Sequence, residues 1–425
     1  MFPKTRTYHD PLHGAITLDG RDPVEALLIQ LIDTVAFQRL RRIRQLGPAS
    51  LTFHGAESSR FTHSLGVMAI ARWAFDRLAS VYAELQPHRA AVLCGALLHD
   101  IGHGPYSHTS EDVFGGHHEG WTQRILTEEP EVRGLLDAFD PALLTAIIDV
   151  YQHQHAVPLI WQLVSSQLDC DRIDYLLRDS YFTGASYGQL DLDRIILALD
   201  FDPDSQQLVV ERKGLAAIEH YLVVRYFMYA QIYNHPKNLS ATWMLEQIFC
   251  RARELLKVGD LSADDTVVAW LTQTVDALPL SAYLAGDDIV FSYHLQRWQT
   301  HPDTLLSGLC RHLVNRQLLK TLDVSHHSPA EQAQILATVR QRLGQQGGSY
   351  SSLRHVSSHG YTLYQRGIKL KTESGLTEIS QLSPLVKTLT QPYQRTWLLY
   401  PESLRVEISE LVEKATGSMP RDHIV

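Results

Sequence analysis

The stretch His99-Asp100-Ile101-Gly102-His103-Gly104-Pro105-Tyr106-Ser107-His108 decides which fold this chain can adopt. The residues before it, from about Pro87 to Asp100, predict a helix that is apolar on most sides, and such a helix belongs at the centre of a core. The run from Gly102 to Pro105 must end that helix. Three imidazoles and a carboxylate therefore gather at a chain break beside the core, where side chains can converge on a ligand.

The adjacent pair His99-Asp100 suits a divalent cation. A buried carboxylate is costly unless an opposite charge compensates it, and a cation does this directly. Imidazole and carboxylate ligands suit Mn, Fe or Zn, or Mg where oxygen ligands dominate. For an isolated pair, a hydrogen bond at the end of a helix is the structural alternative.

A second cluster is Arg60-Phe61-Thr62-His63-Ser64-Leu65-Gly66-Val67. Arg60 and His63 are three residues apart, so they share one face of a predicted helix that begins near Ser59. Gly66 lies on the same face and would let another helix approach closely. Taken alone, His63 also fits a hydrogen-bonded histidine of the core.

A third cluster spans Asp169 to Asp179. Asp171, Tyr175 and Asp179 are spaced by four residues and line one helical stripe, which indicates the wall of a polar pocket. Asp174 and Arg178 pair on a neighbouring stripe, and a solvated face is the alternative for Asp169, Asp174 and Arg178.

A fourth run, Tyr233-Asn234-His235-Pro236-Lys237-Asn238, follows a long predicted helix. Its cation could sit at the negative end of the helix dipole as part of a C-cap. It could equally form a basic lip over bound phosphate.

The hydrophobic pattern predicts a mainly α fold: a helical core with a short β-hairpin and a small C-terminal α+β lobe. Helices are predicted at 22–46, 59–75, 87–100, 106–114, 118–128, 140–150, 156–178, 191–200, 214–233 and onward to about 343. Residues 206–211 predict a short strand, and Gly344 to Ser352 predict a linker. Beyond the linker, strands are predicted at 361–364, 368–372 and 395–400, with a last helix at 404–414. The predicted domains are therefore residues 1–345 and 346–425.

Composition narrows the class of protein. The chain has 425 residues and a formal net charge of -9, which argues against a nucleic-acid partner. The N-terminus lacks the apolar core of a signal peptide, and the best apolar run, Ala90 to Leu98, is too short to span a membrane. The four cysteines show neither a C-x-x-C pair nor zinc-ribbon spacing, so we expect reduced thiols in a cytoplasmic protein.

In order and spacing, these clusters resemble the HD-domain phosphohydrolases, and within them the dNTP triphosphohydrolases of the SAM-and-HD-domain type and their bacterial relatives. The resemblance runs from about Tyr8 to Thr321 and more weakly beyond, and it implies a helical HD-domain core. Besides the stretch quoted first, it rests on these motifs: Asp10-Pro11-Leu12-His13-Gly14, Phe37-Gln38-Arg39-Leu40-Arg41, Arg60-Phe61-Thr62-His63-Ser64-Leu65-Gly66, His118-Glu119 and Asp171-Arg172-Ile173-Asp174-Tyr175.

The resemblance also implies roles for single residues. It places a divalent metal (Mn, Fe, Mg or Zn) on four side chains: His63, His99, Asp100 and Asp171. The implied catalytic residues are His103, His108, His118 and the carboxylate partner of the acid histidine, Glu111. The implied sugar contacts are Gln45, Leu46, Tyr175 and Asp179, and the implied triphosphate contacts are Arg60, Tyr233, His235 and Lys237. A nucleotide effector site is implied at Arg6, Asp33, Gln38 and Arg41.

The chain departs from the family pattern at two of these positions. Glu111 stands where the pattern has Asp, so the reach of this carboxylate differs. Pro236 follows His235 where a basic residue is expected, and we expect Lys237 to replace that residue.

The resemblance implies an enzyme that converts a dNTP and water into a deoxynucleoside and triphosphate, and that forms nucleotide-activated dimers or tetramers. Two alternatives stay open: an HD-family hydrolase of another nucleotide or phosphoester, and a nucleotide sensor without turnover. The complete metal set and the additional histidines argue against a pure sensor. A structural zinc protein fits least, because structural zinc prefers thiolate ligands.

Overall fold

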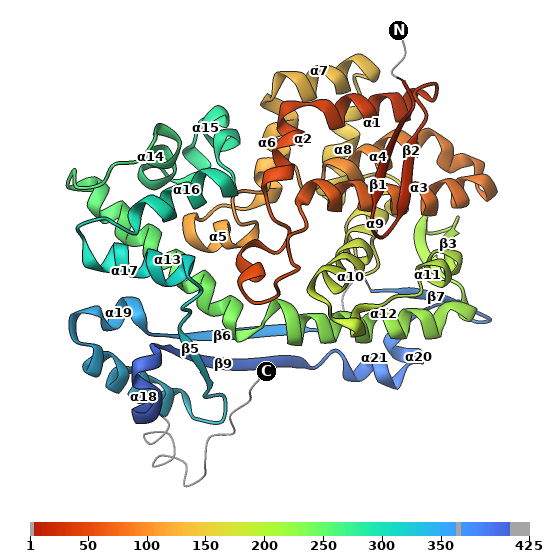
Figure 1. Cartoon of the computed structure of the whole chain (residues 1–425). Helices are drawn as coiled ribbons and strands as arrows, with labels where there is room; N and C mark the ends of the chain where they lie inside the picture. Colours follow the sequence, from red (N-terminus) through yellow and green to blue (C-terminus); the bar gives the residue numbers. More distant parts are fainter. Residues whose placement is uncertain (1–3, 363–366, 409–425) are drawn as a thin grey trace. The chain divides into compact units, whose positions relative to one another are not determined.

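A computed structural model describes residues 4–362 and 367–408 of the chain (Figure 1). The chain forms two compact units, each assembled from separate segments. Unit 1 comprises Met1–Tyr229, Gln273–Ile289 and His359–Gln391, and unit 2 comprises Ala230–Thr272, Val290–Ser358 and Pro392–Val425. The domain division at residue 345 stays a prediction, and the residues on both sides of it belong to unit 2.

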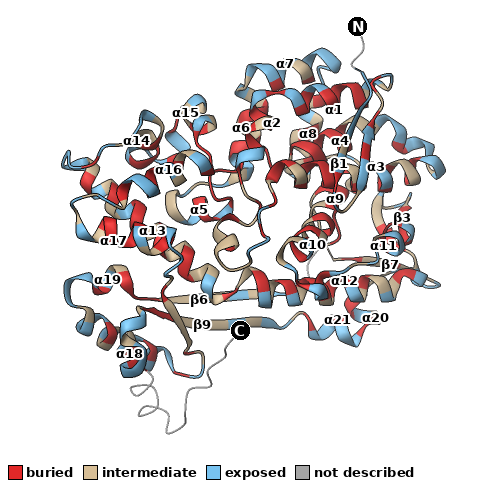
Figure 2. Cartoon of the chain, viewed as in Figure 1, coloured by how far each residue is buried: buried red, intermediate tan, exposed pale blue. Residues whose placement is uncertain are grey.

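The core of unit 1 is built around α4 (Arg89–Leu98), the apolar helix that precedes His99. Every residue of α4 from Ala91 onward is buried (Figure 2). The helices packed against it are α1 (Pro23–Asp33), α3 (Arg60–Val81), α8 (Leu143–Tyr151) and α9 (Pro158–Val164). α3 also packs against α10 (Cys170–Thr183). The prediction of a central apolar helix is confirmed, and this packing brings the second and third sequence clusters to the end of α4.

The helix predicted over residues 22–46 is broken at Thr34, where α1 ends and α2 (Val35–Gln38) begins. Thr34 has an extended backbone, with φ -60° and ψ 146°. Its hydroxyl accepts from the N–H of Phe37 at 3.3 Å and donates to the carbonyl of Leu31 at 2.7 Å. These side-chain hydrogen bonds replace the backbone hydrogen bonds of a continuous helix, so the helix ends at Thr34. The spacing of apolar residues does not reveal such a break.

The helix predicted at 118–128 is confirmed with the same ends as α6 (His118–Glu128). Other predicted helices of unit 1 are confirmed with shifted ends: α5 (His108–Phe114), α8, α11 (Leu192–Ala198) and α12 (Leu215–Met228). The prediction missed α7 (Pro130–Phe139). The single helix predicted at 156–178 is two helices, α9 and α10. Asp169 caps α10 by accepting from the N–H of Arg172 at 2.7 Å. After α12, the last five residues of the predicted helix form a π-helical turn, Tyr229–Tyr233.

Two sheets complete unit 1. β1 (Arg6–Asp10) and β2 (Gly14–Leu18) form an antiparallel hairpin. The second sheet has the order β3-β4-β7-β8, with these strands: β3 (Leu199–Asp202), β4 (Gln207–Val210), β7 (Lys369–Thr372) and β8 (Gly375–Glu378). The strands predicted at 206–211 and 368–372 are confirmed. Residues 361 and 362 form no strand, and residues 363 and 364 lie outside the described part of the chain.

In unit 2, the long helix α13 (Pro236–Lys257) packs against α14 (Asp265–Thr272) and α17 (Thr304–Val314). A three-stranded sheet has the order β5-β9-β6, with the strands β5 (Lys320–Asp323), β6 (Ser352–His359) and β9 (Pro392–Tyr400). Residues of α18 (Pro329–Leu343) share a core with this sheet. The strand predicted at 395–400 is confirmed. Of the last predicted helix, residues 405–408 are helical, and residues 409–414 lie outside the described residues.

The linker predicted from Gly344 to Ser352 is wrong. This segment contains a short helix, α19 (Gly347–Tyr350), in which both end residues are buried. A Cβ at Gly347 would lie 2.6 Å from the carbonyl oxygen of Arg340. Gly347 therefore permits close packing against Arg340, whereas the composition of the segment had indicated a flexible linker.

Among residues 4–362 and 367–408, no helix combines the length and the hydropathy that crossing a bilayer requires.

We predict that Gly66→Ala disturbs the contact between α3 and α10. A Cβ at Gly66 would lie 1.9 Å from Asp174 Oδ1 and 2.5 Å from Arg178 Nη2. We expect a free energy of unfolding about 1–3 kcal/mol lower than wild type, measured by urea denaturation. The control is Gly134→Ala in α7, where nothing lies within 4 Å of the added Cβ and a gain of about 0.5–1 kcal/mol is expected. Equal effects of the two substitutions would contradict this packing.

Candidate metal centre and active site

Three helices bring the predicted metal ligands together. His63 lies in the first turn of α3, which Ser59 caps by accepting from the N–H of Thr62 at 3.4 Å. His99 is the residue that follows α4, and Asp171 lies in the first turn of α10. The helix ends therefore present an imidazole, an imidazole and a carboxylate to the same point.

Outer hydrogen bonds decide which nitrogen of each imidazole faces this centre. His99 Nδ1 lies 2.8 Å from the carbonyl oxygen of Ala96, and His63 Nδ1 lies 2.8 Å from Asp174 Oδ2. Both oxygens accept, so Nδ1–H is the donor in each pair. The two Nε2 atoms, 3.3 Å apart, are then the ring nitrogens that face the centre. Outer partners of this kind orient metal-binding imidazoles.

Two carboxylates complete the centre. Asp171 Oδ1 lies 3.0 Å from His63 Nε2 and 3.6 Å from His99 Nε2. Asp100 Oδ2 lies 3.5 Å from His63 Nε2, and Asp100 Oδ1 lies 3.4 Å from His99 Nε2. His63, His99 and Asp171 each offer one ligand atom, and these atoms lie within 4.8 Å of one another, so the three side chains could hold one ion. Asp100 contacts the two imidazoles through different oxygens and is not part of that group, so its role as the fourth ligand stays a prediction. Imidazole and carboxylate donors fit Mn, Fe, Zn or Mg.

The charges in the centre favour a cation. Burial lowers the pKa of His63, but hydrogen bonds to Asp171 and Asp174 outweigh it and raise this pKa to about 9. Burial raises the pKa of Asp171, but hydrogen bonds from His63 and His99 outweigh it and lower this pKa. A proton on His63 thus offsets the surrounding carboxylates, and a bound divalent cation would replace that proton.

Behind His63 lies a buried ionic network. Arg178 donates from Nε to Asp174 Oδ2 at 2.8 Å, from Nη2 to Asp174 Oδ1 at 3.0 Å, and from Nη1 to Asp10 Oδ2 at 2.9 Å. His13 Nε2 lies 2.6 Å from Asp174 Oδ1. The side chains of Asp174 and Arg178 are fully buried. The network therefore links the β1–β2 hairpin to the metal centre.

The solvated face that the sequence indicated for Asp169, Asp174 and Arg178 is wrong, since all three are buried. Helical spacing showed that Asp174 and Arg178 could pair. It could not show that the β1–β2 hairpin, more than 150 residues earlier in the sequence, supplies Asp10 and His13 to the same network. The signal was present in the motif Asp10-Pro11-Leu12-His13-Gly14, to which no role had been given.

Arg60 connects the metal centre to the loop that follows it. Its Nη1 donates to Asp100 Oδ2 at 2.6 Å, its Nε donates to Ser107 Oγ at 2.9 Å, and its Nη2 donates to the carbonyl of Gln45 at 3.2 Å. Arg60 is buried. It therefore holds one proposed ligand in place, while its contact with a triphosphate stays a prediction.

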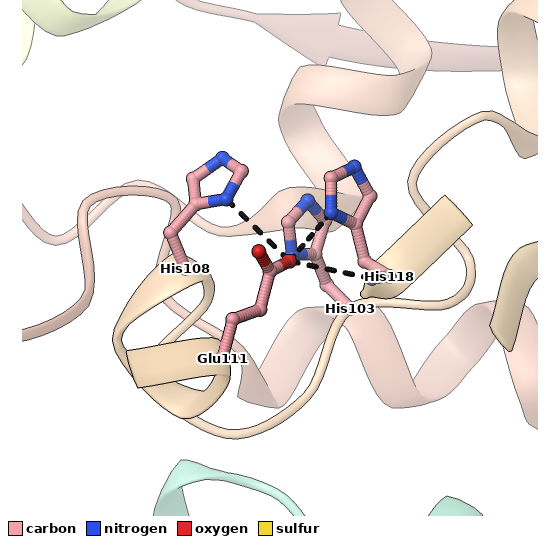
Figure 3. A group of neighbouring side chains, drawn as sticks. All are labelled: His103, His108, Glu111 and His118. Carbon is pink, nitrogen blue, oxygen red and sulfur yellow. Dashed lines mark hydrogen bonds and ion pairs between the residues drawn. The ribbon is translucent and has the colours of Figure 1, made fainter. Parts of the chain in front are cut away.

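The four predicted catalytic residues form a second cluster (Figure 3). Glu111 Oε1 lies 2.6 Å from His118 Nδ1 and 3.6 Å from His108 Nδ1. Burial raises the pKa of Glu111, but the hydrogen bonds from His108 and His118 outweigh it and lower this pKa. The side chain of His108 is 66% exposed, whereas that of His103 is 1% exposed. The glutamate therefore serves two imidazoles, one of which faces solvent.

Atoms of this second cluster also lie within 4.8 Å of one another, as in a metal site. However, the rings of His103 and His118 are stacked, with centroids 3.9 Å apart and planes 11° apart. The lone pair of an imidazole nitrogen lies in its ring plane, so two stacked rings cannot both bind one cation. Burial, Arg60 and His118 together lower the pKa of His103, which keeps this imidazole neutral. The cluster fits proton and phosphate handling better than a second ion.

The loop between the two clusters has a strained backbone. Tyr106 has φ +62° and Ser107 has φ +56°, in the left-handed region that costs a residue with a side chain of order 1–3 kcal/mol. Gly47 allows this conformation, because a Cβ there would lie 2.5 Å from the carbonyl oxygen of Tyr106. The loop turns Ser107 towards Arg60. The sequence indicated a chain break here, but it did not indicate strain.

The predicted sugar contacts all belong to unit 1. Gln45 and Asp179 are buried, while Leu46 and Tyr175 are half-buried. Arg172, which the sequence analysis did not single out, donates from Nη1 to the hydroxyl of Tyr175 at 3.4 Å. Its position directly after Asp171 was the available signal, and it places a positive charge beside Tyr175.

The predicted effector residues meet in pairs. Arg6 and Asp33 form an ion pair near the surface. Arg41 donates from Nε to Gln38 Oε1 at 2.8 Å, and its guanidinium lies 3.5 Å from the centre of the Phe61 ring. Their role in binding an effector stays a prediction.

The remaining predicted triphosphate contacts, Tyr233, His235 and Lys237, belong to unit 2. His235 caps α13, where its Nδ1 accepts from the N–H of Lys237 at 3.2 Å. Burial and the charge of Lys237 lower the pKa of His235 to about 4, so its ring is neutral and can accept. Their contact with phosphate stays a prediction.

Comparison with known proteins finds a match to the HD domain and relatives that include phosphohydrolases. The HD domain matches residues 60–179, and the HD associated region matches residues 190–270. YwfO of Bacillus subtilis is 35% identical over 94% of this chain and 93% of its own length. The deoxynucleoside triphosphate triphosphohydrolase SAMHD1 homolog of Dictyostelium discoideum is 30% identical over 61% of this chain and 52% of its own length. The crystal structure of a phosphohydrolase from Bacteroides thetaiotaomicron superposes with a TM-score of 0.82 and 29% identity, covering 94% of this chain and 100% of that chain.

We predict that His99→Ala and Asp171→Ala weaken the binding of Mn²⁺ by at least about tenfold, because each removes a ligand. The measurement is calorimetric titration with Mn²⁺ alone, with helical content checked by circular dichroism. His220→Ala, on the exposed side of α12, is the control and should bind as the wild type does. Unchanged affinity in either ligand variant would overturn the assignment.

Proposed function

The chain belongs to the HD-domain phosphohydrolases, and from this premise we propose that it hydrolyses deoxynucleoside triphosphates to deoxynucleoside and triphosphate. HD domains depend on a divalent metal, and the His63 cluster has the donors to bind one. The similarity to the SAMHD1 homolog of Dictyostelium discoideum supports a deoxynucleotide as the substrate.

One observation carries the proposal: the metal centre and the histidine cluster adjoin each other. His103 Nε2 lies 3.2 Å from Asp100 Oδ1, so a predicted catalytic residue touches a predicted ligand. Hydrolysis of a phosphate ester needs a cation at the phosphoryl group and a proton donor at the leaving oxygen. The chain holds side chains suited to both tasks next to each other.

When bound, the cation supplies Lewis acidity at a phosphoryl oxygen. Four side chains would hold it: His63 and His99 through Nε2, and Asp100 and Asp171 through carboxylate oxygens. Asp174 and the carbonyl of Ala96 keep the two imidazoles turned inward. Arg60 fixes Asp100 through a hydrogen bond of 2.6 Å.

Water attacks the α-phosphorus in the proposed reaction, and the bond to the nucleoside 5′-oxygen breaks. That oxygen needs a proton, which His108 donates as the general acid. Glu111 lies 3.6 Å from Nδ1 of this imidazole and orients it. The buried, neutral His103 and the imidazole of His118 donate hydrogen bonds to phosphate oxygens.

The proposal extends to recognition and assembly. Tyr175 and Asp179 read the 3′-hydroxyl, with Gln45 and Leu46 completing the sugar pocket. Arg60 is the proposed phosphate contact of unit 1, and Tyr233, His235 and Lys237 are the proposed phosphate contacts of unit 2. A nucleotide effector binds at Arg6, Asp33, Gln38 and Arg41 and favours homo-dimers or tetramers of a cytoplasmic enzyme.

We predict the products from a panel of the four dNTPs with Mn²⁺ or Mg²⁺, tested with and without GTP or dATP as effector and resolved by ion-exchange chromatography. Deoxynucleoside and inorganic triphosphate should form in equal amounts, and reaction in H₂¹⁸O should label the triphosphate. Asp171→Ala is the inactive control. Monophosphate with pyrophosphate would contradict departure of the 5′-oxygen, and turnover of other phosphoesters alone would favour a different HD-family activity.

We predict that His108→Ala lowers kcat by roughly 10²–10⁴-fold, the usual contribution of a general acid. Mn²⁺ affinity should not change, because His108 lies outside the metal centre. The control is His117→Ala, whose side chain is 82% exposed and lies 3.8 Å from Glu111. If both variants turn over at the wild-type rate, His108 is not the acid.

A further inference from the structure

The strained loop Gly102–Ser107 is held from a part of the chain that neither family match covers. The two matches end at residues 179 and 270, whereas the segment Gln273–Ile289 folds into unit 1. This segment contains α15 (Leu280–Ala285) and the start of α16 (Asp288–Trp298). Its contacts with the loop are specific hydrogen bonds.

Asp288 accepts a hydrogen bond from Tyr106, one of the two strained residues of the loop. It is buried, and its Oδ1 accepts from the N–H of Tyr106 at 2.6 Å. Its Oδ2 accepts from the N–H of Arg44 at 3.0 Å. The carbonyl of Arg44 in turn accepts from the hydroxyl of Ser107 at 2.6 Å. The Asp288 carboxylate therefore holds Tyr106 directly and holds Ser107 indirectly, through the backbone of Arg44.

Tyr283 and Arg39 hold the beginning of the same loop. The hydroxyl of Tyr283 donates to the carbonyl of Gly102 at 2.5 Å. Arg39 donates from Nη1 to the carbonyl of His103 at 2.8 Å and from Nε to the carbonyl of Gly286 at 3.0 Å. Two loop carbonyls are thus fixed, one by the segment itself and one through an arginine bound to it.

The segment also supports α6, which begins with His118. The ring of Tyr283 stacks on Trp121 of α6, with centroids 3.6 Å apart and planes 6° apart. Arg124 of α6 donates from Nη1 to the carbonyl of Leu278 at 2.8 Å. The stretches that carry His103 and His118 therefore both contact Gln273–Ile289.

We propose that Asp288 and Tyr283 are positioning residues, which hold the Gly102–Ser107 loop in its strained conformation and so place His103 and Ser107 for catalysis. Asp288 accepts from the N–H groups of Tyr106 and Arg44, and Tyr283 donates to the carbonyl of Gly102. They act through the chain of contacts from Ser107 to Arg60 and from Arg60 to Asp100. The strain at Tyr106 and Ser107 persists because this segment holds it.

The first test is hydrogen exchange of the full chain, measured by mass spectrometry, on Asp288→Asn and Tyr283→Phe. Asparagine can accept only one of the two backbone N–H groups, and phenylalanine keeps the stacking on Trp121 but loses the hydroxyl. Amides of residues 102–107 should exchange roughly tenfold faster, as expected for the loss of one strong hydrogen bond. Asp276→Asn, exposed in the same segment, is the control. Unchanged exchange, or a uniform rise across unit 1, would overturn the proposal.

The second test is steady-state kinetics, which rests on the proposed hydrolase activity. Asp288→Asn and Tyr283→Phe should lower kcat by roughly 10- to 100-fold, with KM within about twofold and Mn²⁺ affinity unchanged. Wild-type kcat in both variants would overturn the positioning role. A wild-type protein without turnover would overturn the proposed function instead, while the exchange experiment would still decide whether the segment holds the loop.

Discussion

The hydrogen bond between Asp174 and His63 is the interaction on which the rest of the site depends. A buried carboxylate is tolerated only when its charge is compensated and its oxygens are satisfied. Here Arg178 supplies the charge, and His13 and His63 take the remaining acceptor positions. The arrangement locks α3 to α10 and turns His63 Nε2 towards Asp171. It therefore joins the stability of the core to the geometry of the metal centre.

The imidazoles of His63 and His103 have pKa values shifted in opposite directions, because their surroundings differ. Carboxylates around His63 raise its pKa to about 9, which reflects a place suited to a cation. Burial, Arg60 and His118 lower the pKa of His103, which leaves it neutral beside the proposed phosphate position. Asp100 lies between the two environments, since it contacts both His63 and His103, and Arg60 donates a hydrogen bond to it. Two functions can thus operate a few ångströms apart.

Local pattern predicted some elements well and others poorly, for identifiable reasons. The apolar helix before His99 is unambiguous, because a helix with no polar face has no place except the core. The break at Thr34 was missed, because a capping hydroxyl leaves no mark on hydrophobic spacing. The glycines near residue 347 suggested a linker, although one of them allows contact with Arg340. Glycine content alone does not distinguish flexibility from close approach.

The sequence by itself determined which side chains are proposed to carry the chemistry: the ligand set, the three additional histidines and Glu111 are what its resemblance to the HD-domain phosphohydrolases implies. It also determined the helices that present them, since apolar periodicity is a local property. Only the tertiary structure decided that Asp174 and Arg178 are buried, that a hairpin from the first twenty residues completes their network, and that residues 273–289 hold the strained loop. These features arise from contacts between residues far apart in the chain, and no local pattern records such contacts.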